Sequence, residues 1–508
     1  MVSLIDYLLD RITMYRLVQW DLRILIGLAA VFGEFGLIPF GSFAILWSTL
    51  LLVVVCWISN KVFSWAFAAP ANAESVYITA LILALIISPV ASLQFSSVMF
   101  LVWAGVLAMA SKYILAINKK HIFNPAAIAV VITAYTIHQS ASWWVGNAVM
   151  MPFVIIGGFL IVRKIRRWDL VLSFLIAALL TMLVFAIIKG ASLPDTLNQL
   201  LLHSSLFFFA FVMLTEPLTT PPQRLQRILY GVLVGILFAP DVHVFGIYST
   251  PELALVISNI FSYLVSPKQK LLLRLQDKIR IAPGIVDFLF TPEKQLQFLP
   301  GQYMEWTLPH PSSDFRGTRR YFTIASSPTE QTLRVGVRVY EKGSSFKKKM
   351  IAMNDQDVIV AGQLAGEFTL PKDPKQKIVL IAGGIGITPY RSMIKYLLDT
   401  KESRPIILIY ANKTPAEIVY TDVFDQAQKE LGIKTIYTLT DSNAVPKNWQ
   451  GKVGRISKAM IKEEVPDYMD RIFYLSGPHP LVSSCEKVLR DLGVAGAHIR
   501  TDYFPGLA

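Results

Sequence analysis

Cysteine and histidine are scarce in this chain, which has two cysteines and seven histidines among 508 residues. Cys56 and Cys485 lie in opposite halves of the chain, so no disulfide is predicted, and two thiols are too few for a four-thiolate iron–sulfur cluster. The front half holds four histidines, which are His121, His138, His203 and His243. Their spacing does not repeat as it would for pairs of axial haem ligands on facing helices. The sequence therefore predicts no metal site and no haem.

Charge is also scarce: 16% of the residues are charged, 54% are hydrophobic, and the mean hydropathy is +0.49. These values exceed those of soluble domains, and the apolar excess lies before Pro267. Apolar runs of about 17 to 25 residues suit membrane-spanning helices. Ten such runs are predicted, near 22–41, 43–58, 76–94, 96–115, 124–137, 149–162, 169–188, 198–214, 228–240 and 250–265. We expect an all-α membrane bundle of about ten helices over 21–266, after an amphipathic segment at 1–20. The runs at 124–137 and 149–162 are short, so eight or nine spans also fit.

The net charge of +13 comes largely from lysine and arginine in the loops and in the back half. In the front half these residues fall on one side of the predicted bundle, and only Lys189 is expected on the other. The positive-inside rule then places the N-terminus and the back half in the cytoplasm, with the bundle crossing the cytoplasmic membrane many times. Anionic lipid headgroups, rather than nucleic acid, are the expected partners of these cations.

Residues 377–389 read as an apolar strand, a glycine-rich turn and the start of a helix. The turn contains Gly383, Gly384 and Gly386. Because glycine has no Cβ, backbone N–H groups of the turn can approach a phosphate closely. Thr388 as N-cap and Pro389 as first helical residue are expected to open the helix. A nucleotide is the expected ligand.

Apolar runs alternate with helical stretches around this turn, which predicts a doubly wound parallel sheet over 375–508. The predicted strands are 377–382, 405–411, 435–440 and 471–476, with helices at 388–400 and 481–492. Residues 270–372 contain shorter segments rich in Val, Phe and Tyr, separated by proline and glycine. This pattern is typical of a small antiparallel β-barrel.

Four motifs in order, 320–323, 343–346, 383–389 and 474–478, resemble the ferredoxin-NADP reductase family over 272–508. The resemblance implies that Arg320 holds the FAD pyrophosphate, Phe322 lies against the isoalloxazine and Thr323 lies near its N5. It further implies a phosphate-binding turn at 343–346 and a nicotinamide dinucleotide at the glycine turn and at Gly477 and Pro478. The expected binding residues are Arg320, Tyr321, Phe322, Thr323, Gly343, Ser344, Ser345, Gly383, Gly384, Gly386, Thr388, Pro389, Gly477 and Pro478. The expected catalytic residues are Thr323, Ser476 and Phe504.

Several positions depart from that family's pattern. Phe322 stands in place of the usual tyrosine, which keeps a ring but removes a phenolic hydroxyl. Ser476 stands in place of the common cysteine beside the nicotinamide, and Phe504 matches the aromatic residue near the family's C-terminus. The choice between NADH and NADPH depends on the ends of two strands, at Asn412, Lys413, Thr440, Asp441 and Ser442. Asp441 would repel a 2′-phosphate whereas Lys413 would not, so NADH is slightly favoured.

In the front half, residues 121–127 and 215–222 resemble subunits B and D of the sodium-pumping NADH:quinone reductase and of the Rnf complex. Asn124 and Glu216 are polar groups expected at membrane depth, which makes them candidates for a membrane site. They also fit helix-breaking proline turns with satisfied polar neighbours. The Ser-Gly-Ala-Thr motif that carries covalent FMN in that family is missing. A noncovalent second flavin, or a quinone stacked on Trp143 or Trp144, remains open.

Together these patterns predict a membrane-integral flavoprotein that passes electrons from NAD(P)H through FAD to a quinone, a second flavin or another acceptor in the membrane. One alternative is a redox-sensing or ion-transporting membrane protein with a regulatory flavin domain. A haem-type ferric reductase is disfavoured by the histidine pattern. No internal repeat in the sequence is strong enough to use, and the sequence does not identify the acceptor.

Overall fold

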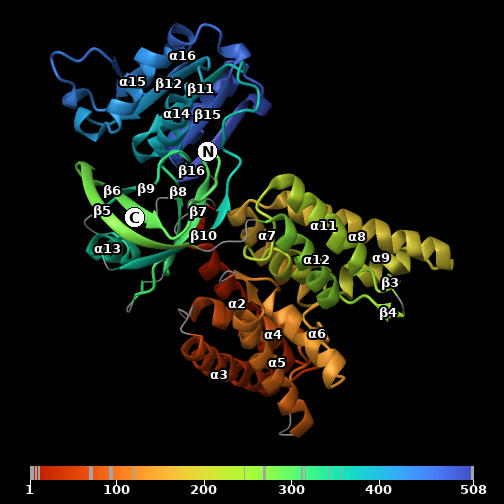
Figure 1. Ribbon diagram of the computed structural model, residues 1–508. Helices are drawn as coiled ribbons and strands as arrows, with labels where there is room; N and C mark the ends of the chain where they lie inside the picture. Colours follow the sequence, from red (N-terminus) through yellow and green to blue (C-terminus); the bar gives the residue numbers. More distant parts are fainter. Residues whose placement is uncertain are drawn as a thin grey trace. The chain divides into compact units, whose positions relative to one another are not determined.

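The computed structural model describes residues 5, 8–9, 12–67, 73–90, 95–117, 120–244, 246–266, 271–310, 313–314, 316–340, 343–355 and 357–504. The chain forms two compact units, Ile12–Lys270 and Leu271–Ala508 with Met1–Arg11. We call them the helical unit and the sheet unit and describe each by itself. Figure 1 labels their elements.

The helical unit repeats one order of elements. Each half has two helices, a short or bent helical segment, a further helix, a two-stranded hairpin and a short helix that begins with proline. The first half is α2 (Met14–Glu34), α3 (Ser42–Ala66), α4 (Ala73–Ile86), α5 (Phe95–Ile114), β1 (Ala116–Ile117) with β2 (Lys120–His121), and α6 (Pro125–Thr136). The second half is α7 (Met151–Ile165), α8 (Trp168–Lys189), α9 (Leu193–Leu202) with α10 (Leu206–Phe208) and the π-helix η1 (Phe209–Met213), α11 (Arg224–Phe238), β3 (His243–Val244) with β4 (Ile247–Tyr248), and α12 (Pro251–Val265).

Packing in the helical unit follows the same repeat. Helix α3 packs on α5 as α8 packs on α11, and α5 packs on α6 as α11 packs on α12. The equivalent helices α2 and α7 contact each other, and so do α6 and α12. These pairs are those expected if an approximate twofold rotation relates the halves. The sequence did not reveal this repeat, because helix packing fixes the order of elements while leaving most side chains free to differ.

Among the described residues, three helices of the helical unit, α3, α5 and α8, are each long and apolar enough to cross a bilayer. Helix α9 with α10 and η1 would be a fourth such span if the pair, bent by 55°, is taken as one. The apolar helices α4, α6 and α12 are shorter. The predicted count of ten spans is therefore not confirmed. The predicted boundary after residue 20 was wrong, because α2 runs without a break from Met14 to Glu34.

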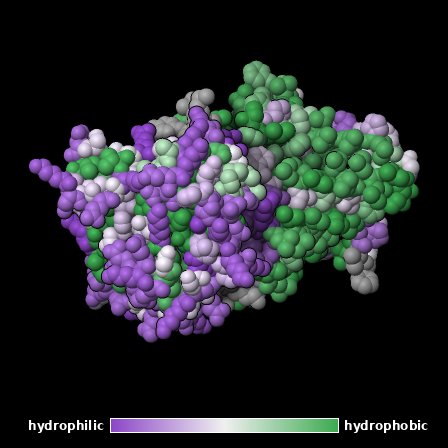
Figure 2. Space-filling view, turned by 90° about the horizontal axis from the view of Figure 1, so that it is seen from above, coloured by the Kyte–Doolittle hydropathy of each residue, from purple (hydrophilic) through white to green (hydrophobic). Residues whose placement is uncertain are grey.

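Apolar side chains cover the outside of the helical unit as well as its core. On α8 the exposed residues recur about once per turn, at Leu172, Ile176, Leu180 and Val184, each about half exposed or more. The hydrophobic surface in Figure 2 contrasts with the largely hydrophilic surface of the sheet unit. Soluble monomers rarely expose such continuous apolar surface, which instead suits a lipid environment.

The sheet unit contains one antiparallel and one parallel sheet. The antiparallel sheet has the order β8-β7-β10-β5-β6-β9. Its strands are β5 (Leu271–Ala282), β6 (Ile285–Pro292), β7 (Tyr303–Thr307), β8 (Arg319–Thr323), β9 (Leu333–Arg338) and β10 (Val358–Ala365), with helix α13 (Ser345–Ala352) between the last two. No ladder joins β8 to β9 among the described residues, although Ala325 N donates to Arg334 O at 2.8 Å just beyond β8. Closure into a barrel therefore stays a prediction.

The parallel sheet has the order β14-β13-β12-β11-β15-β16. Its strands are β11 (Ile378–Gly383), β12 (Ile406–Asn412), β13 (Lys434–Leu439), β14 (Lys452–Val453), β15 (Ile472–Pro478) and β16 (Ile499–Phe504). Helices α14 (Thr388–Thr400) and α15 (Thr421–Leu431) pack on one face, and α16 (Lys458–Glu464) and α17 (His479–Asp491) pack on the other. Alternate residues of β11 face the two layers: Leu380 lies with α14 and Ile381 with α17. The predicted doubly wound sheet is confirmed.

Candidate functional site

Two glycine-containing turns meet at the carboxyl edge of the parallel sheet. Gly384 has a φ of +53° and Gly477 a φ of +145°, and residues with a side chain rarely adopt such values. A Cβ built on Gly386 would lie 2.5 Å from Gly477 Cα and 2.5 Å from Ser476 O, and one built on Gly477 would lie 3.0 Å from Gly383 O. The turns after β11 and β15 therefore touch through bare backbone. Two predicted motifs that are far apart in the sequence form one surface.

The start of α14 differs from the prediction in one detail. A 3₁₀ turn, η2 (Gly384–Ile387), precedes the helix, and the helix N-cap is Ile387 rather than Thr388. Thr388 is the first helical residue, and its hydroxyl donates to Ile385 O at 3.2 Å. The N-cap prediction was wrong because the tight turn shifts the helix start by one residue. Pro389 still lies in the first turn, as predicted.

Ser476, predicted beside the nicotinamide, is fully buried next to the paired turns. Its Oγ has no hydrogen-bond partner among the described residues. A buried hydroxyl without a partner is costly, so a ligand amide that bonds to it would remove that cost. On the neighbouring strand, Asp502 lies opposite Ser476 and Phe504 lies opposite Pro478. The side chain of Phe504 lies outside the described residues.

A cluster of cations surrounds the start of α13. Burial lowers the pKa of Lys347 to about 8, with further contributions from the positive charges of Arg320, Arg316 and Arg338. Arg320 also lies over the Phe346 ring, with its guanidinium carbon 5.2 Å from the ring centroid. So much positive charge around one lysine is unfavourable unless an anion joins it. The cluster fits a phosphate, and the sequence motif did not reveal Lys347.

The N-terminus of α13 already binds one anionic oxygen. Asp314 Oδ2 accepts from Ser345 N at 2.8 Å and from Arg316 Nη2 at 2.8 Å. Burial alone would raise the pKa of Asp314, but these hydrogen bonds and the charge of Arg316 lower it. Ser344 is the N-cap, and its hydroxyl accepts from Lys347 N at 3.4 Å. The predicted turn at Gly343, Ser344 and Ser345 is thus a helix start that favours negative charge.

Strand β8 places its aromatic side chains on opposite faces. Phe322 lies opposite Met304 of β7 and packs against the apolar core, 6.0 Å from Phe346 between ring centroids. Tyr321 is 39% exposed, and its hydroxyl donates to Glu305 Oε2 at 2.8 Å. Because side chains alternate along a strand, Tyr321 and Phe322 point to opposite faces of the sheet. Tyr321 therefore presents its ring on the exposed face, whereas Phe322 lies beside the same Phe346 ring as Arg320. The sequence assigned the flavin contact to Phe322, and this assignment stays a prediction. Thr323 shares the face of Tyr321 and is buried.

The strand ends that were expected to select the nicotinamide cofactor lie side by side. Thr440 N donates to Asn412 O at 2.9 Å, and Asp441 N donates to Lys413 O at 3.3 Å. The Asp441 carboxylate accepts from Asn443 N at 3.0 Å, which fixes its place at this edge. One cation and one anion therefore flank the same position. The slight preference for NADH stays a prediction.

A hydrogen bond to a buried carboxylate and an ion pair connect the two sheets, and nothing in the sequence pointed to them. Asp287 of β6 is fully buried and accepts from Tyr420 Oη at 2.5 Å and from Arg334 Nη1 at 2.6 Å. Arg391 of α14 donates to both carboxylate oxygens of Glu330, at 2.8 and 3.0 Å. Burial by itself would raise the pKa of Glu330, but the hydrogen bonds and charge of Arg391 lower it. These contacts hold the parallel sheet and the antiparallel sheet in one orientation.

The helical unit brings together the two motifs predicted there. His121 Nε2 lies 3.5 Å from Glu216 Oε1, and Thr219 Oγ1 donates to Glu216 Oε2 at 3.1 Å. Asn124 is the N-cap of α6, since its Oδ1 accepts from Ala126 N and Ala127 N, each at 3.1 Å. Asn124 is therefore a satisfied structural group, and a role in electron or ion transfer stays a prediction.

A polar chain across the repeat was missed by the sequence analysis. Asn124 N donates to Asn259 Oδ1 at 2.8 Å, and Asn259 Nδ2 donates to Tyr230 Oη at 2.8 Å. Asn259 and Tyr230 are fully buried. The chain ties α6 of the first half to α11 and α12 of the second. Asn259 interrupts an otherwise apolar run, which was the only signal the sequence offered.

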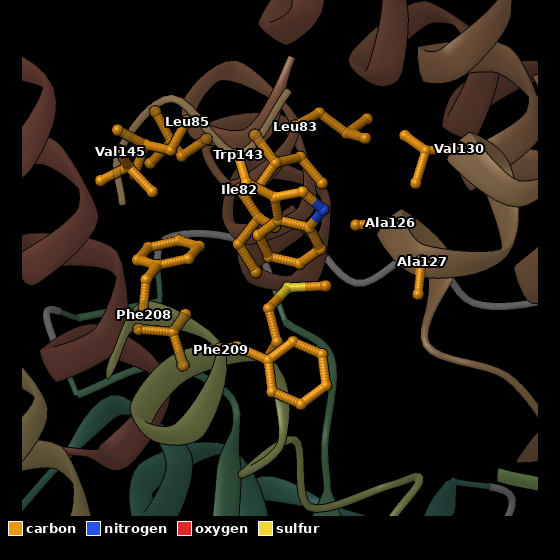
Figure 3. Close-up of a cluster of buried hydrophobic side chains, with 14 of the residues drawn as sticks. Ile82, Leu83, Leu85, Ala126, Ala127, Val130, Trp143, Val145, Phe208 and Phe209 are labelled. Carbon is orange, nitrogen blue, oxygen red and sulfur yellow. The ribbon is translucent and has the colours of Figure 1, made fainter. Parts of the chain in front are cut away.

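Trp143 and Trp144 lie in the core of the helical unit, where Figure 3 shows Trp143 among apolar side chains of both halves. Trp143 is 8% exposed and Trp144 9% exposed. Trp143 Nε1 donates to Glu252 Oε2 at 2.9 Å, and Trp144 Nε1 donates to Ala84 O at 3.0 Å. Both indole N–H groups are thus satisfied and neither ring has an open face. A quinone or flavin stacked on either ring would require these contacts to open.

Two family models match the chain. Residues 137–268 match the NQR2, RnfD, RnfE family, and residues 380–487 match the oxidoreductase NAD-binding domain. The first match covers the second half of the helical unit with Glu216, and the second covers the paired glycine turns. Both sequence resemblances are thereby confirmed.

Three similar proteins each match less than half of this chain. A flavohemoprotein of Bacillus thuringiensis subsp. konkukian is 27% identical over 240 residues, which is 45% of this chain and 59% of that protein. The NADH-cytochrome b5 reductase 1 of Mortierella alpina is 29% identical over 235 residues, 45% of this chain and 77% of that protein. The solved cytochrome b5 reductase domain of Ulva prolifera nitrate reductase has a TM-score of 0.42 and 22% identity, covering 47% of this chain and 98% of that one.

The chain thus spans about three fifths of the length of the flavohemoproteins that it matches. The Mortierella alpina relative is a reductase by name, and the matched oxidoreductase NAD-binding domain carries the paired turns. In one polypeptide the chain joins a segment that matches the NQR2, RnfD, RnfE family model to a segment that matches the oxidoreductase NAD-binding domain model.

Proposed function

We propose that the chain is a membrane-integral flavoprotein oxidoreductase that takes a hydride from NAD(P)H and passes the electrons through FAD to a quinone or a second flavin in the membrane. One observation carries the proposal: the sheet unit combines an anion-binding cation cluster with paired glycine turns, and the same chain continues into an NQR2, RnfD, RnfE segment. By the charge distribution of the loops, the N-terminus and the sheet unit are cytoplasmic, where the nicotinamide cofactor is found.

The residues of the sheet unit would hold the cofactors as follows. Arg320, Lys347 and the N-terminus of α13 bind the FAD pyrophosphate, and Tyr321 with Thr323 faces the isoalloxazine. The paired turns bind the nicotinamide dinucleotide, and Ser476 orients its amide. FAD, when bound, supplies the hydride and electron chemistry. The chain itself contributes orientation, a positive field at the phosphates and exclusion of water.

The proposal is tested by the absorbance spectrum of the detergent-purified protein before and after anaerobic NADH or NADPH, with acid-released flavin identified as FAD or FMN. We expect one FAD that bleaches with reduced nicotinamide. Arg320→Ala should weaken FAD binding by about 10- to 100-fold, because a charged hydrogen bond contributes about 1.5–3 kcal/mol. Normal FAD content in that variant would contradict the assignment of Arg320, and protein without FAD would contradict the function.

A second function is favoured by the helical unit alone. Two halves with the same order of elements and short helices at equivalent places are typical of ion transporters. Electron transfer in this chain would then be coupled to ion movement, or the sheet unit would regulate transport. NADH-driven ion uptake into proteoliposomes that hold the purified protein tests this alternative, and quinone reduction without any uptake would exclude coupling.

A further inference from the structure

Asp21 is a buried carboxylate of the helical unit that has no polar partner in the described part of the chain. It lies in α2, two turns from the helix start, and only 9% of its surface is exposed. Its Oδ2 makes no hydrogen bond among the described residues. Neither the two sequence motifs nor the polar chain through Asn259 involves it. A charged group in this position would be buried without compensation.

Asp21 packs directly against the backbone of α7. A Cβ built on Gly157 would lie 1.7 Å from Asp21 Oδ1 and 2.6 Å from its Cγ. Glycine at 157 is therefore what makes room for the carboxyl group. Helices α2 and α7 are the first helices of the two halves and contact each other. Asp21 thus lies where the halves of the repeat meet.

The charged groups around Asp21 are engaged elsewhere. Helix α2 packs on α3, α4 and α7. Among the described residues, the other charged side chains of these four helices are Arg16, Arg23, Glu34, Lys61, Glu74, Arg163 and Lys164.

Most of these charged groups contact other side chains. Arg16 pairs with Glu74 at 3.2 Å, and Lys61 lies over the Trp57 ring. Arg23 lies over the Trp20 ring, and Glu34 accepts from Ser42 at 2.5 Å. Arg163 and Lys164 lie in the last turn of α7, beyond Gly157 along the helix. In the described part of the chain, none of them forms an ion pair with Asp21.

An isolated carboxylate is far more costly to bury than the neutral acid. A metal cation would need several oxygen ligands, whereas Asp21 faces a glycine backbone on one side and offers a single carboxyl group. A proton needs only that one group. We propose that Asp21 is a proton-binding site: its carboxyl group carries a proton at neutral pH and exchanges it when the membrane acceptor is reduced.

The exchange step rests on the proposed function. Reduction of a quinone to a quinol takes up two electrons, which NAD(P)H supplies through the flavin, and two protons. Asp21 would release its proton to the quinone as it is reduced, become a carboxylate, and recover a proton from water. Because Asp21 lies between the two halves, a small shift of α2 against α7 would change its exposure to water and so its affinity for the proton.

The test is infrared spectroscopy of the full-length protein in detergent at neutral pH, in H₂O and in D₂O. We expect a C=O stretching band of a protonated carboxylic acid that shifts in D₂O and that Asp21→Asn removes. Asp195→Asn is the matched control, because Asp195 is an exposed aspartate of the same unit, and it should leave the band unchanged. A band that persists in Asp21→Asn, or no band in the natural protein, would overturn the proposal.

A second variant and a redox measurement complete the test. Asp21→Leu is neutral and of similar size, so it serves if Asp21→Asn does not fold, and it should also remove the band. Addition of NADH should then perturb the band in the natural protein, and an unperturbed band with a bleached flavin would overturn the exchange step. If NADH and NADPH both fail to bleach the flavin, the proposed function fails, while the resting band still reports on Asp21.

Discussion

Lys347 shows how burial and neighbouring cations change the ionisation of one side chain. Its pKa is lowered to about 8 by burial and by neighbouring arginines, whereas lysine in an unfolded chain titrates near about 10.4. Between these values the unfolded chain binds more protons than the folded one. The stability of the flavin-free protein therefore rises with pH from about 8 to about 10.4 as the penalty of the buried charge is relieved. A bound pyrophosphate would reverse this preference, because it favours the protonated lysine.

We predict that FAD affinity depends on pH through Lys347. The affinity should be highest below about pH 8 and fall above it by up to about tenfold per pH unit, as Lys347 loses its proton. Lys347→Met should bind FAD more weakly and show no such fall. Lys348→Met, which changes an exposed lysine of the same helix, should behave like the natural protein. FAD titrations followed by flavin fluorescence at several pH values measure this; an unchanged pH profile in Lys347→Met would contradict it.

Tyr321 and Phe322 are neighbours in sequence with opposite surroundings. We predict that Tyr321→Ala increases the fluorescence of bound FAD, because a ring against the isoalloxazine quenches it, and changes stability little. Phe322→Ala should instead lower the free energy of unfolding by about 3 kcal/mol, because it leaves a cavity in the antiparallel sheet's core. Flavin fluorescence and thermal unfolding of both variants distinguish the roles. Brighter flavin only in Phe322→Ala would restore the assignment made from the sequence.

At the scale of elements, the paired turns after β11 and β15 depend on backbone contact. A side chain at residue 386 would meet the backbone of Ser476 and Gly477, so it would separate the two turns proposed to bind the nicotinamide dinucleotide. The antiparallel sheet, which carries the residues proposed to bind FAD, does not share these contacts. The two cofactors should therefore respond differently to a change in this turn.

We predict that Gly386→Ala raises KM for NADH on the order of tenfold or more, about 1.4 kcal/mol, while the purified protein retains its FAD. Gly496→Ala is the control, because a Cβ there meets only the end of Arg490, at 3.9 Å. Steady-state reduction of ferricyanide, which accepts electrons without protons, measures the effect. Equal KM values in the two variants would show that the turn contact is not needed for nicotinamide binding.

At the scale of the whole molecule, the helical unit is held together across its repeat by the chain Asn124–Asn259–Tyr230. Removal of the central amide would leave Asn124 N and Tyr230 Oη without these partners, at a cost of about 1–3 kcal/mol for each buried group. The sheet unit has its own core and its own hydrogen bonds. Damage to the helical unit should therefore leave flavin chemistry intact.

We predict that Asn259→Leu lowers the thermal stability of the helical unit and lowers quinone reduction, while NADH:ferricyanide activity remains. Ser173→Ala, a partly buried helical residue that donates only to its own helix at Leu170 O, should change neither property. Differential scanning fluorimetry and the two acceptor assays give the readouts. Loss of both activities in Asn259→Leu would show that the two units depend on each other.

The sequence by itself determined the features that depend on neighbours along the chain. The βαβ order, the glycine turn at 383–386 and the apolar character of the front half follow from hydrophobic periodicity and from residues that only certain backbone shapes accept. These patterns also gave both family resemblances. They predicted the N-cap of α14 at Thr388, one residue after the observed N-cap, because a 3₁₀ turn precedes the helix and helix boundaries are uncertain by a residue or two.

Only the tertiary structure decided which distant groups meet. It joined Gly386 to Gly477, gathered Lys347 with three arginines, turned Tyr321 outward and Phe322 inward, and paired Asp21 with Gly157. The repeat in the helical unit also emerged only there. Contacts of this kind depend on how whole elements pack, and a residue's sequence neighbours carry little information about a partner on another element.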